Sequence, residues 1–360
     1  MSQNDYMMDG HKLLWHLERV TAWQAGELIA PIYVEISPVS FCNHRCQFCG
    51  LDFAQGERIS LDTAVTCRSL QEMAQLGVKS IMFAGEGEPL LHPGLPEMVA
   101  VAKESGLDVS ITTNGSLGTP EVWQSVIPRL SWLRFSVDAG SPDVYARVHG
   151  VGSAAFEKTV ESIRQALVVR DATGSSCTIG VQFLLIRDNL ADLAQAIQLF
   201  GAMGVDYLSL KPYSEHPQML NKSDFTYDAE AIAGIDAIVE QYQGAFRKTA
   251  IIFRKAATNA YASGSAAFNH CHALPFWGYV SSRGDFYTCS VFLNDERFSV
   301  GNIGVETMQE ILFGMRRQSS VAYGSEELVI GHECRVNCRM ARINEFLELL
   351  SSQPQHVNFI

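Results

Sequence analysis

Short apolar segments alternate along this chain with longer segments in which apolar residues recur at helical spacing. We expect strands at 31–37, 79–85, 107–113, 132–138, 177–186 and 206–211. The helical segments between them cover 60–77, 95–105, 120–129, 154–172 and 189–203. This alternation predicts a parallel sheet with right-handed crossovers, and its six or seven strands are fewer than the eight of a closed barrel.

Two of the helix predictions depend on particular residues. An amphipathic lead-in helix is expected over 11–27, with Leu13, Leu14, Leu17 and Val20 on one side. Ser60 is expected to cap the next helix, which should end at Gly77 because glycine readily takes the left-handed conformation that follows a helix.

The pattern changes after residue 213. Residues 213–224 are polar and turn-rich, and a helix is expected over 228–248. Further along, the apolar segments 276–280 and 285–289 flank a turn at 281–284, which predicts a β-hairpin.

Composition indicates a folded protein from a reducing compartment. Apolar residues make up 47% and charged residues 18% of the chain, which provides a sizeable core and argues against disorder. The sequence has neither a run of about 20 apolar residues nor a secretion signal, so we expect a cytoplasmic protein without a membrane span. A net charge of −12 argues against a nucleic-acid polymer as partner. Nine cysteines at clustered spacings indicate metal binding rather than disulfides.

Three of these cysteines, Cys42, Cys46 and Cys49, follow the first expected strand at C-x3-C-x2-C spacing. Three thiolates can each ligate one iron of a [4Fe-4S] cluster and leave the fourth iron open to a substrate or cofactor. A zinc ion would need a fourth ligand, and His44 is the one available in the loop. Both interpretations fit the spacing.

Several motifs over about residues 30–215 resemble those of radical S-adenosylmethionine (radical SAM) enzymes. They are the cysteine spacing with Phe48 before the last cysteine, the turn 85–89, and the strand ends 111–115 and 135–138. The resemblance implies an α/β fold with a partial (β/α)6 barrel similar to a TIM barrel. It also implies a [4Fe-4S] cluster, S-adenosylmethionine, and a reducing partner such as flavodoxin or ferredoxin. In this family the cofactor is cleaved to a 5′-deoxyadenosyl radical, which abstracts hydrogen from a substrate.

The same resemblance implies a set of cofactor-binding residues, which are Phe48, Gly85, Gly87, Glu88, Thr112, Asn114, Ser136, Asp138 and Arg147. Phe48 is expected against the adenine, and the two glycines should let the backbone approach the cofactor closely. The polar strand ends should hydrogen-bond its ribose and carboxylate, although Thr112 and Ser136 could equally be ordinary polar strand residues. The chain departs from the common pattern at Glu86, in place of a glycine, and at His149, where many relatives carry arginine. Arg147 is the expected substitute for that arginine.

Four more cysteines lie near the carboxyl terminus: Cys271, Cys289, Cys334 and Cys338. The first two, with Gly284 between them, resemble the opening of the SPASM/twitch extension of radical SAM enzymes, in its smaller single-cluster form. The resemblance implies a second, fully ligated [4Fe-4S] cluster that serves as an electron conduit. A four-cysteine zinc site is the alternative, and His270, His272 or His332 could replace one cysteine. The implied organisation is a lead-in helix at 1–30, the barrel at 31–213, a linker and helix at 214–255, and the auxiliary-cluster domain at 256–360.

The leading hypothesis is a two-electron oxidation of a small molecule or peptide, with the second cluster as electron acceptor. Possible bases near the last strand are Asp206, Lys211, Tyr213 and Glu215. The alternative is isomerisation or epimerisation, with Cys177 (or Cys67) returning hydrogen, although both cysteines also fit a structural role. A ribosomal-peptide maturase is a third hypothesis, but only about 30 residues precede the barrel. A non-enzymatic iron–sulfur carrier would need neither a barrel nor an open iron.

Overall fold

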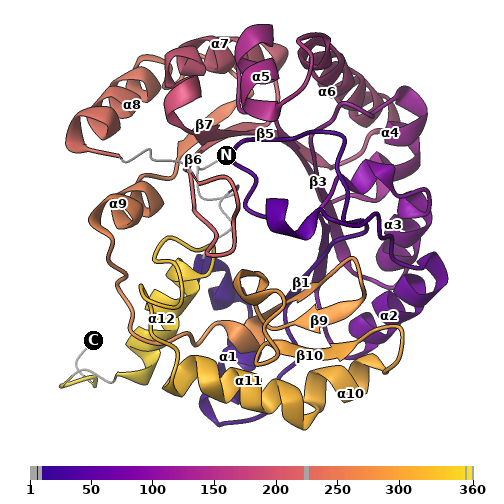
Figure 1. Cartoon of the computed structure of the whole chain (residues 1–360), viewed down its shortest axis with the longest axis vertical. Helices are drawn as coiled ribbons and strands as arrows, with labels where there is room; N and C mark the ends of the chain where they lie inside the picture. The colour runs from indigo at the N-terminus through magenta and orange to yellow at the C-terminus, as the bar shows by residue number, and fades with distance from the viewer. Residues whose placement is uncertain (1–5, 7–9, 223–226, 353–354, 359–360) are drawn as a thin grey trace.

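One curved sheet organises the protein, and its inner face forms the lining of an open barrel (Figure 1). The computed structural model describes residues 6, 10–222, 227–352 and 355–358. Over these residues ten strands pair in the order β10-β9-β8-β1-β2-β3-β4-β5-β6-β7. The strands are β1 Tyr33–Ile36, β2 Ser80–Phe83, β3 Asp108–Thr113, β4 Trp132–Ser136, β5 Thr178–Leu185, β6 Tyr207–Pro212, β7 Ala250–Phe253, β8 Trp277–Val280, β9 Asp285–Tyr287 and β10 Ser299–Asn302.

Helices cover the outer face of the parallel strands, and in Figure 1 they run around the rim in the order α2, α3, α4, α6, α5, α7 and α8. The helices are α1 Leu17–Gln24, α2 Thr63–Gln75, α3 Leu95–Glu104, α4 Pro120–Val126, α5 Pro142–His149, α6 Ala154–Thr173, α7 Leu193–Met203, α8 Ala229–Gln241, α9 Lys255–Ser263, α10 Met308–Phe313, α11 Met315–Glu326 and α12 Ala341–Ser351. The described strands form an open sheet rather than a closed barrel, since β7 and β10 are its two edges. The expected α/β partial barrel is therefore confirmed.

Alternation along the strands separates an apolar outer face from a polar inner face. In β4, Leu133 and Phe135 are fully buried against the helices, while Trp132 and Arg134 line the barrel interior. In β6 the buried Leu208 and Leu210 alternate in the same way with inward-facing residues such as Lys211. The hydrophobic core thus lies between the sheet and the helices, and the barrel interior is lined largely by polar side chains.

The carboxyl-terminal part of the chain completes this sheet. β8 pairs in parallel with β1, with Tyr33 opposite Trp277, and β9 pairs antiparallel with β8, which confirms the hairpin. β7, inside the segment expected to be a linker and helix, pairs in parallel with β6. The sheet therefore continues beyond residue 213, where sequence patterning indicated the end of the barrel.

Two local predictions were wrong. The lead-in segment is a 3₁₀ helix, Gly10–Trp15, followed by α1, so Leu13 and Val20 are buried while Leu14 and Leu17 are exposed. The expected cap Ser60 lies before α2, which is capped by Asp62 instead: its carboxylate accepts a hydrogen bond from the Val65 amide (2.8 Å). A carboxylate next to the first turn outcompetes a hydroxyl two residues further away because it reaches the free amides directly.

Candidate functional site

The loop after β1 holds Cys42, Cys46 and Cys49 at the carboxyl ends of the barrel strands. Backbone and side-chain amides surround their sulfurs: the His44 amide donates to Cys42 Sγ (3.4 Å) and Gln55 Nε2 donates to Cys49 Sγ (3.5 Å). Burial raises the pKa of Cys42 to about 11 and also raises the pKa of Cys46 and Cys49. Three neighbouring thiolates are therefore unfavourable here unless a metal group binds them.

The geometry fits separate irons of a cluster better than one ion. Within the described residues, no three histidine, cysteine, aspartate or glutamate side chains are grouped as ligands of a single metal ion. His44 Nε2 lies 3.2 Å from the Tyr145 hydroxyl and Nδ1 lies 3.3 Å from Asn43 Oδ1, so both ring nitrogens have partners away from the thiols. A zinc ion shared by His44 and the three thiols would need all four within bonding distance of one point.

The glycine turn after β2 packs against the protein itself. Gly85 has φ +110°, and a Cβ there would come within 2.6 Å of the Tyr279 hydroxyl. A Cβ on Gly87 would collide with the backbone oxygen of Phe41, in the cysteine loop. The close approach that these glycines allow is therefore between the turn, the cysteine loop and β8, not only to a cofactor as the sequence suggested.

Glu86, the departure from the family pattern, fastens this turn to the β8–β9 hairpin. Its buried carboxylate accepts hydrogen bonds from the Ser282 amide (3.2 Å), the Ser282 hydroxyl and the Tyr279 hydroxyl (3.3 Å). Burial raises the pKa of Glu86. Sequence patterning gave no sign of this contact because its partners lie almost 200 residues later in the chain.

Glu88 and Asn114 connect the ends of β2 and β3 to the cysteine loop. Glu88 is buried and accepts hydrogen bonds from the Thr113 hydroxyl (2.6 Å) and the Asn114 amide (2.8 Å). Asn114 Nδ2 in turn donates to Asn43 Oδ1 (2.8 Å) and lies 3.8 Å from Cys42 Sγ. The structure thus shows both residues holding the loop in place.

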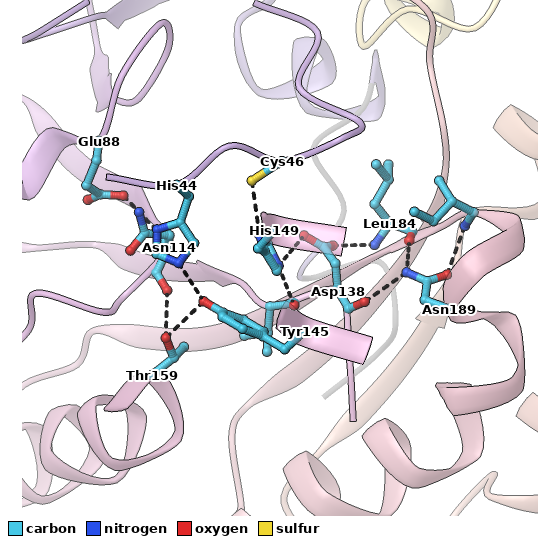
Figure 2. Close-up of polar contacts among 12 residues, drawn as sticks. His44, Cys46, Glu88, Asn114, Asp138, Tyr145, His149, Thr159, Leu184 and Asn189 are labelled. Carbon is cyan, nitrogen blue, oxygen red and sulfur yellow. Dashed lines mark hydrogen bonds and ion pairs between the residues drawn. The ribbon is translucent and has the colours of Figure 1, made fainter. Parts of the chain in front are cut away.

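Asp138 and His149 form a buried chain that ends at a cysteine (Figure 2). Asp138 has φ +56°, and its Oδ1 accepts a hydrogen bond from the Leu184 amide (2.6 Å). His149 Nε2 lies 3.7 Å from Asp138 Oδ2, and Nδ1 lies 3.0 Å from Cys46 Sγ. Burial raises the pKa of Asp138 to about 7. Asp138 is fully buried and turned towards His149, and its contact with the cofactor ribose or carboxylate stays a prediction.

The remaining expected cofactor residues fall into two groups. Arg147 is exposed on α5 and donates to the Asp188 carbonyl oxygen (2.8 Å), and its contact with the cofactor stays a prediction. Phe48 packs edge-on against His149, with ring centroids 5.3 Å apart. Thr112 and Ser136 are half-buried at inward-facing strand positions, where the Thr112 hydroxyl lies 3.5 Å from the Met82 sulfur.

Neither remaining cysteine faces the cysteine loop. Cys177 precedes β5, at the opposite end of the barrel, and belongs to the core between sheet and helices, where burial raises its pKa to about 12. Its neighbour Thr178 lines the interior, so Cys177 points the other way. Cys67 lies on α2 and packs against the outer core. The role of Cys177 as a hydrogen donor stays a prediction, and its thiol lies in the core away from the cysteine loop.

Of the four expected bases, Lys211 lines the barrel interior. Asp206 pairs with Arg170 (2.7 Å), Glu215 pairs with Lys222 (3.1 Å), and the Tyr213 hydroxyl donates to the Met219 sulfur (2.9 Å). None of the other three is among the described residues that line this interior.

The four carboxyl-terminal cysteines, Cys271, Cys289, Cys334 and Cys338, line a second, largely apolar cavity. Asn344 Nδ2 donates to Cys271 Sγ (3.7 Å), and the Val291 amide donates to Cys289 Sγ (3.4 Å). Burial raises the pKa of both Cys271 and Cys289 to about 12. The histidines that could have replaced a cysteine, His270, His272 and His332, are absent from the described lining, and His272 instead lies 3.3 Å from Glu348.

A cavity of about 450 Å³ fills the barrel interior. Its wall includes Trp277, Arg339 and Met340, and the same three residues line the four-cysteine cavity. Arg339 binds Glu35 of β1 and donates to the Tyr33 hydroxyl (3.2 Å). One layer of side chains thus separates the barrel interior from the second group of thiols.

Comparison with known proteins identifies the barrel. Residues 36–207 match the model of the Radical SAM superfamily, which includes the cysteine loop and strands β2 to β5. The chain therefore contains a radical SAM domain over just under half of its length. Such a domain implies S-adenosylmethionine and a [4Fe-4S] cluster, and the three thiols of the loop, with no histidine among them, fit three ligands of that cluster.

Curated relatives match over about half of the chain. The GTP 3′,8-cyclase of Chlorobaculum tepidum is 30% identical over 189 residues, which is 51% of this chain and 55% of that protein. A tungsten-containing aldehyde ferredoxin oxidoreductase cofactor-modifying protein of Pyrococcus furiosus is 29% identical, over 55% of each chain. The match therefore spans about half the length of these relatives.

Solved radical SAM structures extend the likeness of fold. Streptococcus suis SuiB bound to its precursor peptide SuiA is 15% identical, with a TM-score of 0.68 over 95% of this chain and 78% of that one. The protein anSMEcpe with bound AdoMet is also 15% identical, with a TM-score of 0.62 over 87% and 88% of the two chains. Among the described helices of the chain, none has the length and hydropathy of a membrane span.

Proposed function

We propose that this protein is a radical SAM oxidoreductase that removes two hydrogens from a substrate held in the barrel cavity. Cys42, Cys46 and Cys49 would hold the first [4Fe-4S] cluster, and the four carboxyl-terminal cysteines would hold a second. When bound, the reduced first cluster supplies the electron that cleaves S-adenosylmethionine into methionine and a 5′-deoxyadenosyl radical, and the second accepts an electron from the substrate.

The balance of atoms and electrons determines the products of this reaction. The substrate loses one hydrogen atom, which becomes part of 5′-deoxyadenosine, and then one electron and one proton. Its product is therefore two mass units lighter, and one S-adenosylmethionine is consumed per turnover.

The observation that carries the proposal is the shared wall between the two cavities. Trp277, Arg339 and Met340 contact both the barrel interior and the cavity of four thiols, so a substrate radical would lie one side-chain layer from an electron acceptor. Four cysteines satisfy every iron of a cubane, which suits electron transfer rather than substrate binding.

The residues around the cysteine loop support the first half of the reaction. Glu88 and Asn114 fix the loop relative to β2 and β3 through buried hydrogen bonds. Thr112 and Ser136 face inward at the carboxyl ends of their strands, where they could bind the hydroxyls of S-adenosylmethionine. Substrate bound in the polar cavity would displace water from it and so protect the radical from side reactions.

The test compares cysteine variants after anaerobic reconstitution and reduction with dithionite or flavodoxin. Wild type should contain about eight irons per chain, and the triple alanine variant of Cys42, Cys46 and Cys49 should lose about half of them and all 5′-deoxyadenosine formation. Cys289→Ala should still form 5′-deoxyadenosine but lose the product of lower mass, while Cys67→Ala serves as the control. Four irons and one zinc in wild type, or a product with the mass of the substrate, would overturn the proposal.

Isomerisation and peptide maturation are the two alternatives to this oxidation. Isomerisation through Cys177 has lost support because that thiol lies in the core at the far end of the barrel. A peptide substrate remains open, since SuiB and anSMEcpe were each solved with a peptide bound. The mass of the product separates isomerisation, which leaves the mass unchanged, from the other two reactions. Crosslinking of a peptide also removes two hydrogens, so the identity of the substrate distinguishes it from oxidation of a small molecule.

A further inference from the structure

The barrel cavity carries an excess of positive charge. The basic residues in its wall are Lys12, Arg134, Lys211, Arg254 and Arg339. Within the described lining the acidic residue is Asp108, which lies at the amino end of β3 and accepts a hydrogen bond from the Ser131 hydroxyl (2.9 Å). Glu35 is already bound by Arg339. The half of the cavity nearer the cysteine loop therefore contains cations that no lining carboxylate balances.

Two of these cations have no ionic partner. Across the residues that the structure describes, neither the Lys211 ammonium nor the Arg134 guanidinium makes a hydrogen bond or ion pair. Arg134 Nε is fully buried, and the guanidinium carbon lies 5.2 Å from the centre of the Trp132 ring. Both residues are half-buried in the cavity wall, where partial loss of water makes an unpaired cation unfavourable and favours the binding of an anion.

The surroundings of Lys211 agree with this interpretation. Burial and the nearby Arg134, Arg254 and Arg339 lower the pKa of Lys211 to about 7. Asp138 is the acidic group that opposes them, but its carboxylate is buried and engaged by the Leu184 amide. An anion inside the cavity would relieve the repulsion among the cations and restore the charge of Lys211.

We propose that the substrate carries a carboxylate or a phosphate group that binds to Lys211 and Arg134 inside the barrel. Gln182 on β5 lies between them in the sheet order, and Ser209 is its neighbour on β6, so both offer neutral hydrogen bonds to the same group. A cavity of about 450 Å³ suits a small molecule. Lys211 then acts as an anion-binding cation rather than as the base that the sequence suggested. The inference rests on the proposed function in taking the occupant to be the substrate.

Calorimetric titration of the anaerobically reconstituted protein tests this site without turnover. Sodium phosphate and sodium acetate are titrated separately at pH 6.5, with ionic strength held constant by sodium chloride. Lys211→Met and Arg134→Met should each weaken anion binding at least 10-fold. Lys158→Met, which removes the same charge from the exposed surface of α6, should bind as wild type does. Saturable binding of phosphate alone assigns a phosphate ester, and binding of acetate assigns a carboxylate.

The pH dependence provides a second measurement. Raising the pH from 6.5 to 8.5 should weaken binding to wild type several-fold, because Lys211 loses its proton, whereas Lys211→Met should lose this dependence. Circular dichroism checks that the variants fold, and Lys211→Gln replaces Lys211→Met if that variant does not. The anion site is overturned if neither anion binds saturably to wild type. It is also overturned if all variants bind the anions equally.

Turnover separates this inference from the proposed function. Formation of 5′-deoxyadenosine and of a lighter product, without anion binding at Lys211 and Arg134, overturns the anion site alone. Anion binding that Lys211→Met abolishes, in a protein that fails to cleave S-adenosylmethionine, overturns the proposed function alone.

Discussion

Nδ1 of His149 lies 3.0 Å from the sulfur of Cys46, while its Nε2 lies 2.7 Å from the carbonyl oxygen of Val137. A carbonyl oxygen only accepts hydrogen bonds, so Nε2 carries a hydrogen. A metal-bound thiolate also only accepts, so Nδ1 would donate to Cys46 in the cluster-bound protein. Burial lowers the pKa of His149 to about 3 in the metal-free protein, so the second proton would enter only with the cluster-bound thiolates, and the Asp138 carboxylate, 3.7 Å from Nε2, would then balance its charge.

Replacement of this histidine should therefore change the reduction potential of the first cluster. A hydrogen bond to a ligand sulfur stabilises the more negative, reduced state, so His149→Phe should lower the midpoint potential by about 40 mV, equivalent to about 1 kcal/mol. Electron paramagnetic resonance during a redox titration measures it. Tyr145→Phe is the control, because it keeps the ring beside His149 and touches no cysteine. An unchanged potential in His149→Phe would show that the contact has no electronic effect.

Loss of the Glu86 carboxylate should destabilise the joint between the glycine turn and the hairpin. Glu86→Ala leaves buried donors of Ser282 and Tyr279 without acceptors, which should lower the free energy of unfolding by about 1–3 kcal/mol in urea titrations. Glu57→Ala removes a salt bridge (2.6 Å) to Arg283 of the same hairpin, but an exposed one, and should change stability by less than about 1 kcal/mol. Equal effects of the two substitutions would contradict this explanation.

The pair of Glu35 and Arg339 should show strong energetic coupling. Arg339→Met leaves the buried Glu35 carboxylate without its cation and should lower the free energy of unfolding by at least about 2 kcal/mol. Adding Glu35→Gln removes the unpaired charge and should recover most of that loss. A double-mutant cycle measured by urea unfolding checks the coupling, and additive effects would show that the two side chains act independently.

Lys211 should make the stability of the anion-free protein depend on pH. Its pKa is about 7 in the folded protein against an ordinary value of 10.5, so between these values the unfolded chain binds the extra proton. Stability should therefore rise as the pH increases from 7 to 9, by up to about 1 kcal/mol per pH unit, and fall again as the pH returns to 7. Thermal unfolding of wild type and Lys211→Met in chloride buffers measures this. The variant should lack that part of the slope, and parallel profiles would refute the assignment.

Local patterns in the sequence were sufficient to predict β1 to β6, the hairpin and the two groups of cysteines. Strand periodicity and cysteine spacing are properties of residues close in sequence, so they can be recognised without knowledge of the fold. The direction of Asp138 was not predictable, because its positive φ turns the side chain out of the strand alternation. The role of His149 was also missed, since its contact with Cys46 joins α5 to the cysteine loop across about 100 residues. A histidine at a position usually occupied by arginine was the one available signal.

The pairing of β1 with β8 determines when the barrel can be finished during synthesis. Residues 33–36 leave the ribosome long before residues 277–280, and until then β1 has an open edge that other strands could pair with. Closing such a distant contact is slow, so the growing chain needs protection from aggregation over most of its translation. Cys271 and Cys289 lie on either side of the β8–β9 hairpin, so the strand that protects this edge also brings two of the last four thiols into position. Loading of the proposed second cluster is therefore expected to occur only after the nascent barrel is complete.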